Sequence, residues 1–576
     1  MRQIIFPPEI QAFETKLSSK TLKLLTKSIA NFLKDKSELK LEDWYELVRE
    51  LQVQHKVDSP SLWALTAKLA WILTDLEFFA SHHSLLKKFK NAPLLTCYIG
   101  LGLAEFFDFE RGLTLLEKGF EEIKIAMDKD AIIDIITPYS LIMNNSDNHE
   151  KLTSEYNEIQ DLLKIGSADP ITQYPYLIPV YLFVNKKKKK FDYKKQNELL
   201  SSIIKTGNNL DCALTYTLLS SDEDEASHLH KAMSSFKHLS AISAKNRLII
   251  SYTNYANYLG SKAGIGGAQE YFTKAINLAN NLTLDQEQPG PLAVYPLSQQ
   301  AQMQIECGEL DNAGQTFSKL LAVAKVFNNN LYQARAEFGL AYIAFLLMDN
   351  DSALTYANRG LAITNKSLNY KLKCHYELKY AEILLDLNKQ DEAEIFISQL
   401  AERKFSDCAV LYYQYIKGKL ELNRHNIGLA KNILESVLLN SDVCKEIRSS
   451  VLFALTEGYL YEYRISEDLG ILSTAQKTIE DGIHTITDAP RVAKGKWLTS
   501  ILLMAQGKMY EAEDLLIELT SEKKAKVPRI LKLAEELLDR IRQRRIESVD
   551  VSPISNIKDV VRYLRDAKSF IELDSR

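Results

Sequence analysis

Hydrophobic positions recur with helical spacing along almost the whole chain. Between Leu259 and Leu519 one pattern repeats, in which a small residue is followed at the fourth and seventh positions by further packing residues. These positions lie on one face of a helix, because an α-helix has 3.6 residues per turn. The small residues of six clear copies and one looser copy, Ala475, are Ala268, Ala313, Ala353, Ala393, Ala430, Ala475 and Ala512.

The copies follow one another at intervals of about 40 residues, which is the period of a repeated pair of helices. Strand patterns are scarce, and many of the 22 glycines fall at predicted helix ends or at tight contacts between helices. We therefore predict an all-α fold, a right-handed α-solenoid of antiparallel helix pairs. A solenoid grows in one dimension, with each repeat burying its apolar face on its neighbours, so 576 residues need not form several separate cores.

The pattern varies along the chain and predicts four regions. Residues 1–90 form an N-terminal helical segment, 91–240 divergent helical repeats with a break or bend, 241–521 a regular array of about seven repeats, and 522–576 a basic helix followed by a capping helix. Whether residues 130–240 continue the solenoid or form a separate subdomain is left open. The residues that interrupt this stretch are Pro138, Pro170, Pro175 and Pro179.

Local signals predict particular elements. Ser59 and Pro60 read as an N-cap and a first helical residue, and they open one helix from Leu62 to Phe79. A linker with three prolines is expected from Thr283 to Pro296.

The repeat resembles the tetratricopeptide family. That family has a small residue and an aromatic residue in the first helix of each pair, and two small residues around a large one in the second. The best-matching stretch carries Gly339, Tyr342, Ala353, Ala357 and Gly360, and another carries Ala256, Ala268, Phe272 and Ala275. The longer period resembles the variant in the sensor arms of maltose-activator-type regulators, whose ATPase and helix-turn-helix modules have no motif here. The resemblance implies a surface that binds partners.

Composition and charge narrow the function further. The chain has 71 basic and 75 acidic side chains, a formal net charge of -4, so no broad positive field would attract nucleic acid or acidic lipid. Six cysteines lie far apart without a C-x-x-C pair, which indicates buried free thiols in a reducing compartment. No signal peptide and no membrane span is predicted, and we expect a cytoplasmic protein.

Catalytic and metal-binding motifs are lacking. The sequence has no H-E-x-x-H, no G-x-S-x-G and no G-x-x-x-x-G-K-[ST] motif. His228 and His230 lie beside several acidic residues, but on a helix such a pair points apart, which favours a solvated helix start over a metal site. We predict no enzyme activity, no cofactor and no metal.

Two basic segments have alternative interpretations. The first follows a predicted helix, where it could contact nucleic acid or a phosphoinositide, act as a localisation signal, or form a solvated turn favoured by the helix dipole. The second lies on a basic amphipathic helix that could dock on a membrane or an acidic partner, or pack on the last repeat. These segments contain Lys186, Lys187, Lys188, Lys189 and Lys190, and Arg540, Arg542, Arg544 and Arg545.

Partner binding is expected on the first helices of the pairs, which should line the concave face. We predict a protein–protein interaction scaffold that holds a partner peptide or helix there. The alternative is a regulatory or sensor subunit whose basic segments contact nucleic acid or an acidic partner. Neither the identity of the partner nor the oligomeric state follows from the sequence, and the family's two-carboxylate clamp is not found. The candidate contacts are Asn254, Asn257, Gln299, Gln302, Arg335, Lys379, Glu382, Tyr412, Tyr415 and Lys419.

Overall fold

The computed structural model contains only helices as regular elements within the residues that it describes, which confirms the all-α prediction. None of the described helices has the length and apolar character needed to cross a membrane. The predicted capping helix, Ile557 to Ile571, lies outside the described residues. The described ranges are 6–33, 39–73, 75–82, 84–145, 149–163, 180–181, 184, 245–263, 265–281, 291–365, 370–401, 407–440, 443–484, 488–521 and 527–548.

The chain forms two compact units. Unit 1 contains Met1–Gln299 and Ala322–Asn330, and unit 2 contains Gln300–Leu321 and Leu331–Arg576. The change from one unit to the other falls inside helices α17 (Val294–Glu306) and α18 (Leu310–Val326). The division of the chain into the four regions 1–90, 91–240, 241–521 and 522–576 stays a prediction.

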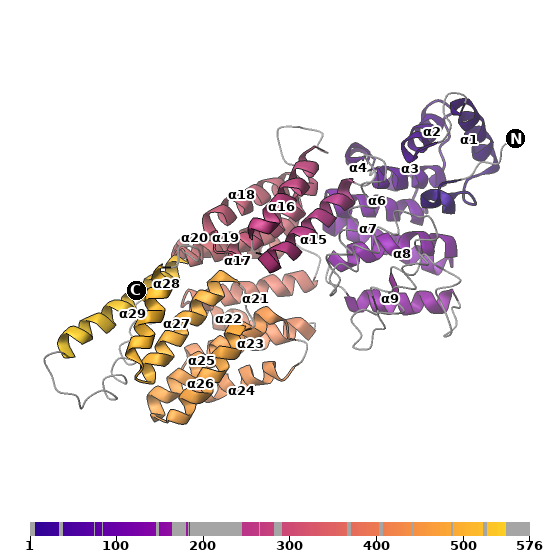
Figure 1. The fold of residues 1–576 in the computed structure, drawn as a ribbon. Helices are drawn as coiled ribbons and strands as arrows, with labels where there is room; N and C mark the ends of the chain where they lie inside the picture. Colours follow the sequence, from indigo (N-terminus) through magenta and orange to yellow (C-terminus); the bar gives the residue numbers. More distant parts are fainter. Residues whose placement is uncertain are drawn as a thin grey trace, which may run out of the picture. The chain divides into compact units, whose positions relative to one another are not determined.

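In unit 1, helices α6 to α9 are stacked in the order in which they occur in the sequence (Figure 1). Helices α6 and α7 lie unusually close, because Gly112 faces the other backbone. A Cβ atom at Gly112 would come within 2.1 Å of the backbone nitrogen of Ala104, so a larger residue cannot fit. The elements are η1 (Pro8–Phe13), α1 (Ser19–Phe32), α2 (Leu41–Val53), α3 (Pro60–Ile72), α4 (Leu76–Ser81), α5 (Leu85–Lys88), α6 (Pro93–Phe106), α7 (Phe109–Ile125), α8 (Lys129–Asn145), α9 (His149–Leu162), α15 (Lys245–Ala263), α16 (Ile265–Asn280) and η3 (Pro291–Ala293).

Three local predictions for unit 1 need correction. The helix predicted from Leu62 to Phe79 is divided into α3 and α4, because Asp75 caps a new helix by accepting a hydrogen bond from the backbone N–H of Phe78. Pro138 does not break the pattern but lies inside α8. Pro296 belongs to the first turn of α17, where its missing N–H needs no partner.

Unit 2 is a continuous array of antiparallel helix pairs. We call the earlier member of each pair its first helix, and α19, α21, α23, α25 and α27 are the first helices used below. Neighbouring first helices contact each other from α21 to α27, and second helices such as α24 and α26 contact the first helix of the next pair. The helices are α19 (Asn330–Leu346), α20 (Asn350–Thr364), α21 (Tyr370–Asp386), α22 (Gln390–Leu400), α23 (Asp407–Asn423), α24 (Ile427–Leu438), α25 (Lys445–Ser466), α26 (Leu469–His484), α27 (Ala489–Ala505), α28 (Met509–Ser521) and α29 (Pro528–Ser548).

The repeated small residues lie in the core, as predicted. All seven alanines are fully buried, and so are partners such as Leu434 and Leu516. Gly339 shows why small residues are needed, because a Cβ atom there would lie 2.5 Å from the ring of Phe317 on the preceding helix. The small residues of the sequence pattern are therefore the places where adjacent helices pack against each other.

The turns inside the pairs share one backbone conformation although their residues differ. In each pair from α17–α18 to α27–α28, the turn that follows the first helix contains a residue with a positive φ, for example Gly308 at 79° and Gly507 at 78°. Non-glycine residues, including Met348 and His425, adopt it in the other turns. This left-handed residue ends the first helix in the way that is common at helix C-termini.

Helix α29 joins the end of unit 2 to its beginning. Arg529 is buried, and its guanidinium lies 4.1 Å from the centre of the Phe345 ring. The same group donates hydrogen bonds of 3.3 Å to the carbonyl oxygen of Phe345 and 3.0 Å to Oδ1 of Asn350. Helix α29 also packs on α27 and α28. Unit 2 is thus closed by a contact between residues about 180 positions apart, and this contact holds its two ends together.

Candidate binding surface on the first helices of unit 2

Glu382 on α21 is the centre of a polar network that joins two adjacent first helices. The hydroxyl of Tyr412 on α23 donates a hydrogen bond of 2.5 Å to Glu382 Oε2, and that of Tyr415 donates one of 3.4 Å to Oε1. Lys379 Nζ lies 3.5 Å from Oε2. Both tyrosines are buried, whereas 18% of the Glu382 side chain is exposed. The carboxylate is therefore held firmly at a surface that solvent still reaches.

A second ion pair continues the network along the same two helices. Lys419 on α23 pairs with Asp386 on α21, and their side chains are 15% and 27% exposed. Asp386 lies four residues after Glu382 and Lys419 four residues after Tyr415, so each helix presents its two groups on one face. We call Lys379, Glu382, Asp386, Tyr412, Tyr415 and Lys419 the Glu382 network.

Electrostatics within this network favour the charged forms. Burial alone would raise the pKa of the Glu382 carboxyl, but Lys379, Lys419 and the hydrogen bond from Tyr412 outweigh it and lower the pKa to about 2. For Lys419, burial would lower the pKa, but Asp386 and other neighbours raise it above the ordinary lysine value. Burial and Glu382 raise the pKa of Tyr412. The network therefore consists of fixed ions and neutral phenols at neutral pH.

Groups from distant helices of unit 2 act on the same place. Arg491, on α27, helps to lower the pKa of Glu382 although α23 and α25 lie between α21 and α27. Arg491 also acts on Tyr342 of α19, and it pairs with Asp488 at 3.1 Å. Groups of α19, α21 and α27 therefore lie within electrostatic range of one another. We call the side of α19, α21, α23, α25 and α27 that carries these groups the inner face of unit 2.

The structure brings five of the ten predicted contact residues into one network. Lys379, Glu382, Tyr412, Tyr415 and Lys419 belong to the Glu382 network, and Arg335 lies on the first helix before it, α19. Burial raises the pKa of Tyr376 on α21, and the positive charge of Arg335 opposes this rise. Their positions within the repeat thus identified residues that share one surface.

The other four predicted residues lie on α15 and α17, and one of them, Gln302, bonds to the Glu306 carboxyl, which Asp488 and Arg491 of the inner face also influence. Asn254 accepts a hydrogen bond of 2.7 Å from the Tyr295 hydroxyl, and Asn257 donates one of 3.2 Å to Gln299. These pairs belong to unit 1. Gln302 lies on α17 in unit 2 and donates a hydrogen bond of 3.0 Å to Glu306. The predicted groove is therefore divided between the units.

Some residues of the inner face were missed from the sequence. Asp386 follows Glu382 by one helical turn and could have been found from that spacing. Asp488 is the N-cap of α27 and Arg491 follows it by three residues, a common helix-start pattern with no hint of a distant partner. Tyr342 was assigned to packing, but it is only half-buried.

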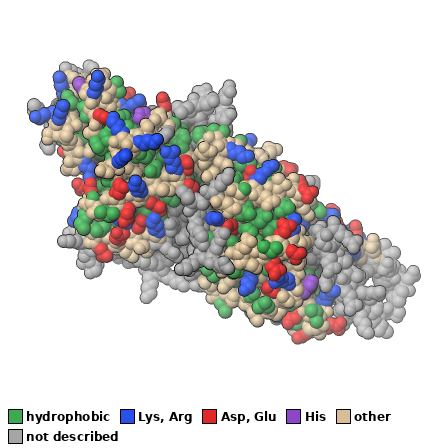
Figure 2. All heavy atoms as spheres, turned by 180° about the vertical axis from the view of Figure 1, so that it is seen from behind, with side chains coloured by type: hydrophobic (Ala, Val, Ile, Leu, Met, Phe, Trp, Pro, Cys, Tyr) green, Lys and Arg blue, Asp and Glu red, His purple; other side chains and the backbone are tan. Residues whose placement is uncertain are grey.

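The basic segments do not form a described patch. Lys186–Lys190 lie outside the described residues, as do the side chains of Arg544 and Arg545. Arg542 Nε lies 3.8 Å from Glu513 on α28, and Arg540 is half-buried. On the face drawn in Figure 2, blue and red side chains are interspersed over the described surface. Helix α29 buries Ile530, Leu537 and Ile541, which fits packing on the last repeat.

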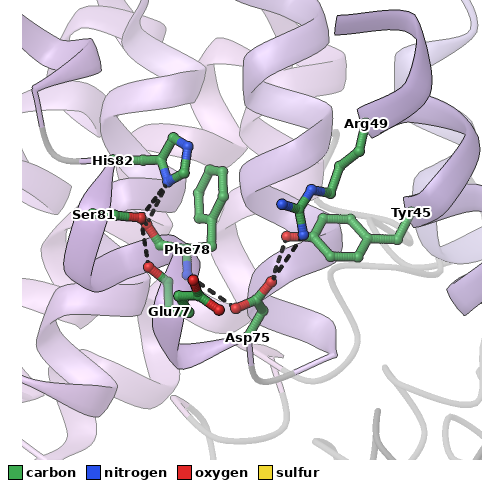
Figure 3. A network of polar contacts seen from close by, with 7 residues as sticks. All are labelled: Tyr45, Arg49, Asp75, Glu77, Phe78, Ser81 and His82. Carbon is green, nitrogen blue, oxygen red and sulfur yellow. Dashed lines mark hydrogen bonds and ion pairs between the residues drawn. The ribbon is translucent and has the colours of Figure 1, made fainter. Parts of the chain in front are cut away.

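A polar network in unit 1 has a local structural role (Figure 3). Asp75 caps α4 and also accepts a hydrogen bond of 2.7 Å from the Tyr45 hydroxyl, while Arg49 lies 3.9 Å away. The His82 ring stacks on Phe78 with centroids 4.6 Å apart. These contacts join α2 to α4 and end α4. No group of His, Cys, Asp and Glu suited to a metal occurs among the described residues.

Comparison with known proteins leaves the family open. No protein-family model and no curated protein matches the chain. Among solved structures, yeast Tom70 is 14% identical, with coverage of 92% of this chain and 97% of that one and a TM-score of 0.35. A Rap protein complexed with competence and sporulation factor is 14% identical, with coverage of 69% and 99% and a TM-score of 0.33. The Cut9 and Hcn1 tetramer structure is 12% identical, with coverage of 92% and 100% and a TM-score of 0.29. These scores carry no argument about function.

Proposed function

We propose that this chain is a non-catalytic interaction scaffold, and that the inner face of unit 2 binds a segment of a protein partner. The observation that carries the proposal is the Glu382 network, whose ions and phenols are already ordered by one another. A preformed surface loses little conformational entropy when a partner binds, so more of the contact energy appears as affinity.

The composition of the inner face also suits a peptide. It combines aromatic side chains that solvent reaches, such as Tyr342 and His375, with charges of both signs, such as Glu382 and Lys419. Tyrosine and arginine are enriched where protein partners bind, because a rigid side chain offers both apolar area and a polar end. The long repeat period supports a further proposal, that unit 2 is an arm like those of maltose-activator-type regulators.

Site-specific photo-crosslinking tests the proposal. A benzophenone amino acid is placed at His375, an exposed position on α21 whose ring lies 6.0 Å from that of Tyr412. The matched control places it at Tyr510 on α28, which is 70% exposed. We expect a discrete protein crosslink from His375 and none of that size from Tyr510, and the crosslinked segment, made as a synthetic peptide, should bind the purified chain.

Equal crosslinking from both positions, or a peptide that does not bind, would contradict the proposal. A crosslink to nucleic acid from either position would instead favour a regulatory subunit that contacts nucleic acid. Phosphate contacts release counterions, so that binding would weaken strongly as salt is raised.

A further inference from the structure

Two polar groups of the inner face have no hydrogen-bond partner among the residues that the structure describes. Arg335 is half-buried and makes neither a hydrogen bond nor an ion pair with any described residue. The hydroxyl of Tyr376, a buried residue, also lacks a hydrogen bond within the described part of the chain. Buried polar groups are normally hydrogen-bonded to protein or to ordered water, so both groups have donors that a ligand could use.

These two groups are neighbours on adjacent first helices. Phe338 follows Arg335 by three residues on α19, so the two side chains lie on one face of that helix. The Phe338 ring stacks on that of Tyr376, with centroids 5.1 Å apart and planes inclined by 10°. Arg335 therefore lies one helical turn from Phe338, whose ring contacts that of Tyr376. Its charge also opposes the rise in the pKa of Tyr376.

Three carboxylates of the inner face already bind other groups. Glu382 accepts hydrogen bonds from two tyrosines, and Asp386 pairs with Lys419. Asp488 pairs with Arg491. These carboxylates are held by other groups, whereas Arg335 has no hydrogen bond or ion pair within the described part of the chain. The hydroxyl of Tyr342, two helical turns further along α19, likewise has no hydrogen-bond partner among the described residues.

We infer that Arg335 and the Tyr376 hydroxyl bind an oxyanion carried by the partner segment. This inference rests on the proposed function, because it names the chemistry that the inner face recognises. A guanidinium offers paired N–H donors in a planar fork that matches two oxygens of a carboxylate or a phosphate. The phenol adds a third donor from the adjacent helix. The oxyanion belongs either to an acidic side chain or to a phosphorylated residue of the segment.

Peptide pools of defined chemistry test the inference. Fluorescein-labelled pools with random flanks and a fixed central Glu, phosphoserine, Gln or Lys are titrated against the full chain, and binding is followed by fluorescence polarisation. We expect the Glu pool, the phosphoserine pool or both to bind about tenfold more tightly than the Gln and Lys pools, which corresponds to ~1.4 kcal/mol. Tighter binding of one acidic pool than the other identifies the source of the oxyanion.

Matched variants assign that preference to the site. Arg335→Gln should abolish the preference for acidic pools, and Tyr376→Phe should reduce it. Arg359→Gln should keep it, because Arg359 is exposed on the second helix α20. Circular dichroism confirms that each variant is folded.

The outcomes separate the two proposals. Equal binding of all four pools, or a preference for acidic pools that survives in Arg335→Gln, overturns the oxyanion site but leaves the scaffold proposal standing. Failure of every pool to bind overturns both proposals.

Discussion

The Tyr412 hydroxyl lies 2.5 Å from Glu382 Oε2 and donates a hydrogen bond across the contact between α23 and α21. The two residues are 30 positions apart in the sequence, and they meet because their helices are equivalent members of successive pairs. The bond fixes the position of a carboxylate at the inner face. Because the bond joins α21 to α23, the state of the Glu382 carboxylate also depends on the packing of these two helix pairs.

Removing the Tyr412 hydroxyl should loosen this contact. We expect Tyr412→Phe to lower the free energy of unfolding by about 1 to 2 kcal/mol, because a hydrogen bond to a charged group is lost from a buried position. Urea unfolding followed by circular dichroism measures the change. Tyr356→Phe is the control, since the Tyr356 hydroxyl has no hydrogen bond to any described residue, and its stability should match that of the unmodified chain. Equal losses in both variants would contradict the assignment.

The lowered pKa of Glu382 predicts a pH dependence. Its value of about 2 in the folded chain lies below the ordinary 4.5, so the unfolded chain takes up the proton first and the free energy of unfolding falls as pH falls from 4.5 toward 2. Glu382→Gln should remove this dependence and lose about 2 to 3 kcal/mol at neutral pH. Urea unfolding at a series of pH values measures both effects.

Glu306 provides a control of opposite sign. The pKa of its carboxyl is raised mainly by burial, and also by the negative charges of Asp488 and Glu446. The folded chain therefore holds this proton more tightly than the unfolded chain, and Glu306 lowers stability above pH 4.5. Glu306→Gln should stabilise the chain at neutral pH and should have little effect at low pH. Parallel pH profiles for the two variants would show that the network is misassigned.

Substitutions at two glycines distinguish the effect of packing on stability from the effect of helix propensity. Gly339→Ala should lower the free energy of unfolding by about 1 to 3 kcal/mol, because the new methyl group would lie 2.5 Å from the ring of Phe317. Gly314→Ala, inside α18 with nothing within 4 Å, should raise it by about 1 kcal/mol. Thermal and urea unfolding compare the two. A loss of stability in both would mean that α18 and α19 pack differently.

The contact of Arg529 should hold the two ends of unit 2 together. We expect Arg529→Ala to lower stability by about 1 to 3 kcal/mol, since a cation–π contact and two hydrogen bonds are lost. Amide hydrogen exchange should accelerate in the turn from α19 to α20. Lys532→Ala, an exposed change on the same helix, should leave that turn unchanged. Unaltered exchange in Arg529→Ala would show that the contact does not close unit 2.

The sequence predicted the features that depend on local spacing. The buried alanines and the shared face of Glu382, Tyr412 and Lys419 follow from helical phase, which acts over a few turns. The electrostatic influence of Arg491 on Tyr342, and the contact of Arg529 with Phe345, depend on how successive pairs are rotated along the array. The overall rotation is the sum of many small rotations between pairs, and no single residue encodes it.

Turn and helix-end details were also missed where several residues suit one conformation. Met348 adopts the left-handed backbone that glycine has at Gly308 and Gly507, so a search for glycine cannot find every turn. Pro138 lies inside α8 although proline is generally unfavourable there. Tertiary packing overrides such local preferences.

Hydroxyl-radical footprinting tests the central claim, that the inner face of unit 2 binds the partner segment. The chain is oxidised with and without the synthetic peptide identified by crosslinking, and modification is measured at His375 and Tyr342 on the inner face and at Tyr510 on α28. We predict that the peptide lowers modification of His375 and Tyr342 several-fold and leaves Tyr510 unchanged. Protection of Tyr510 with full reactivity at His375 would place the binding surface elsewhere and contradict the claim.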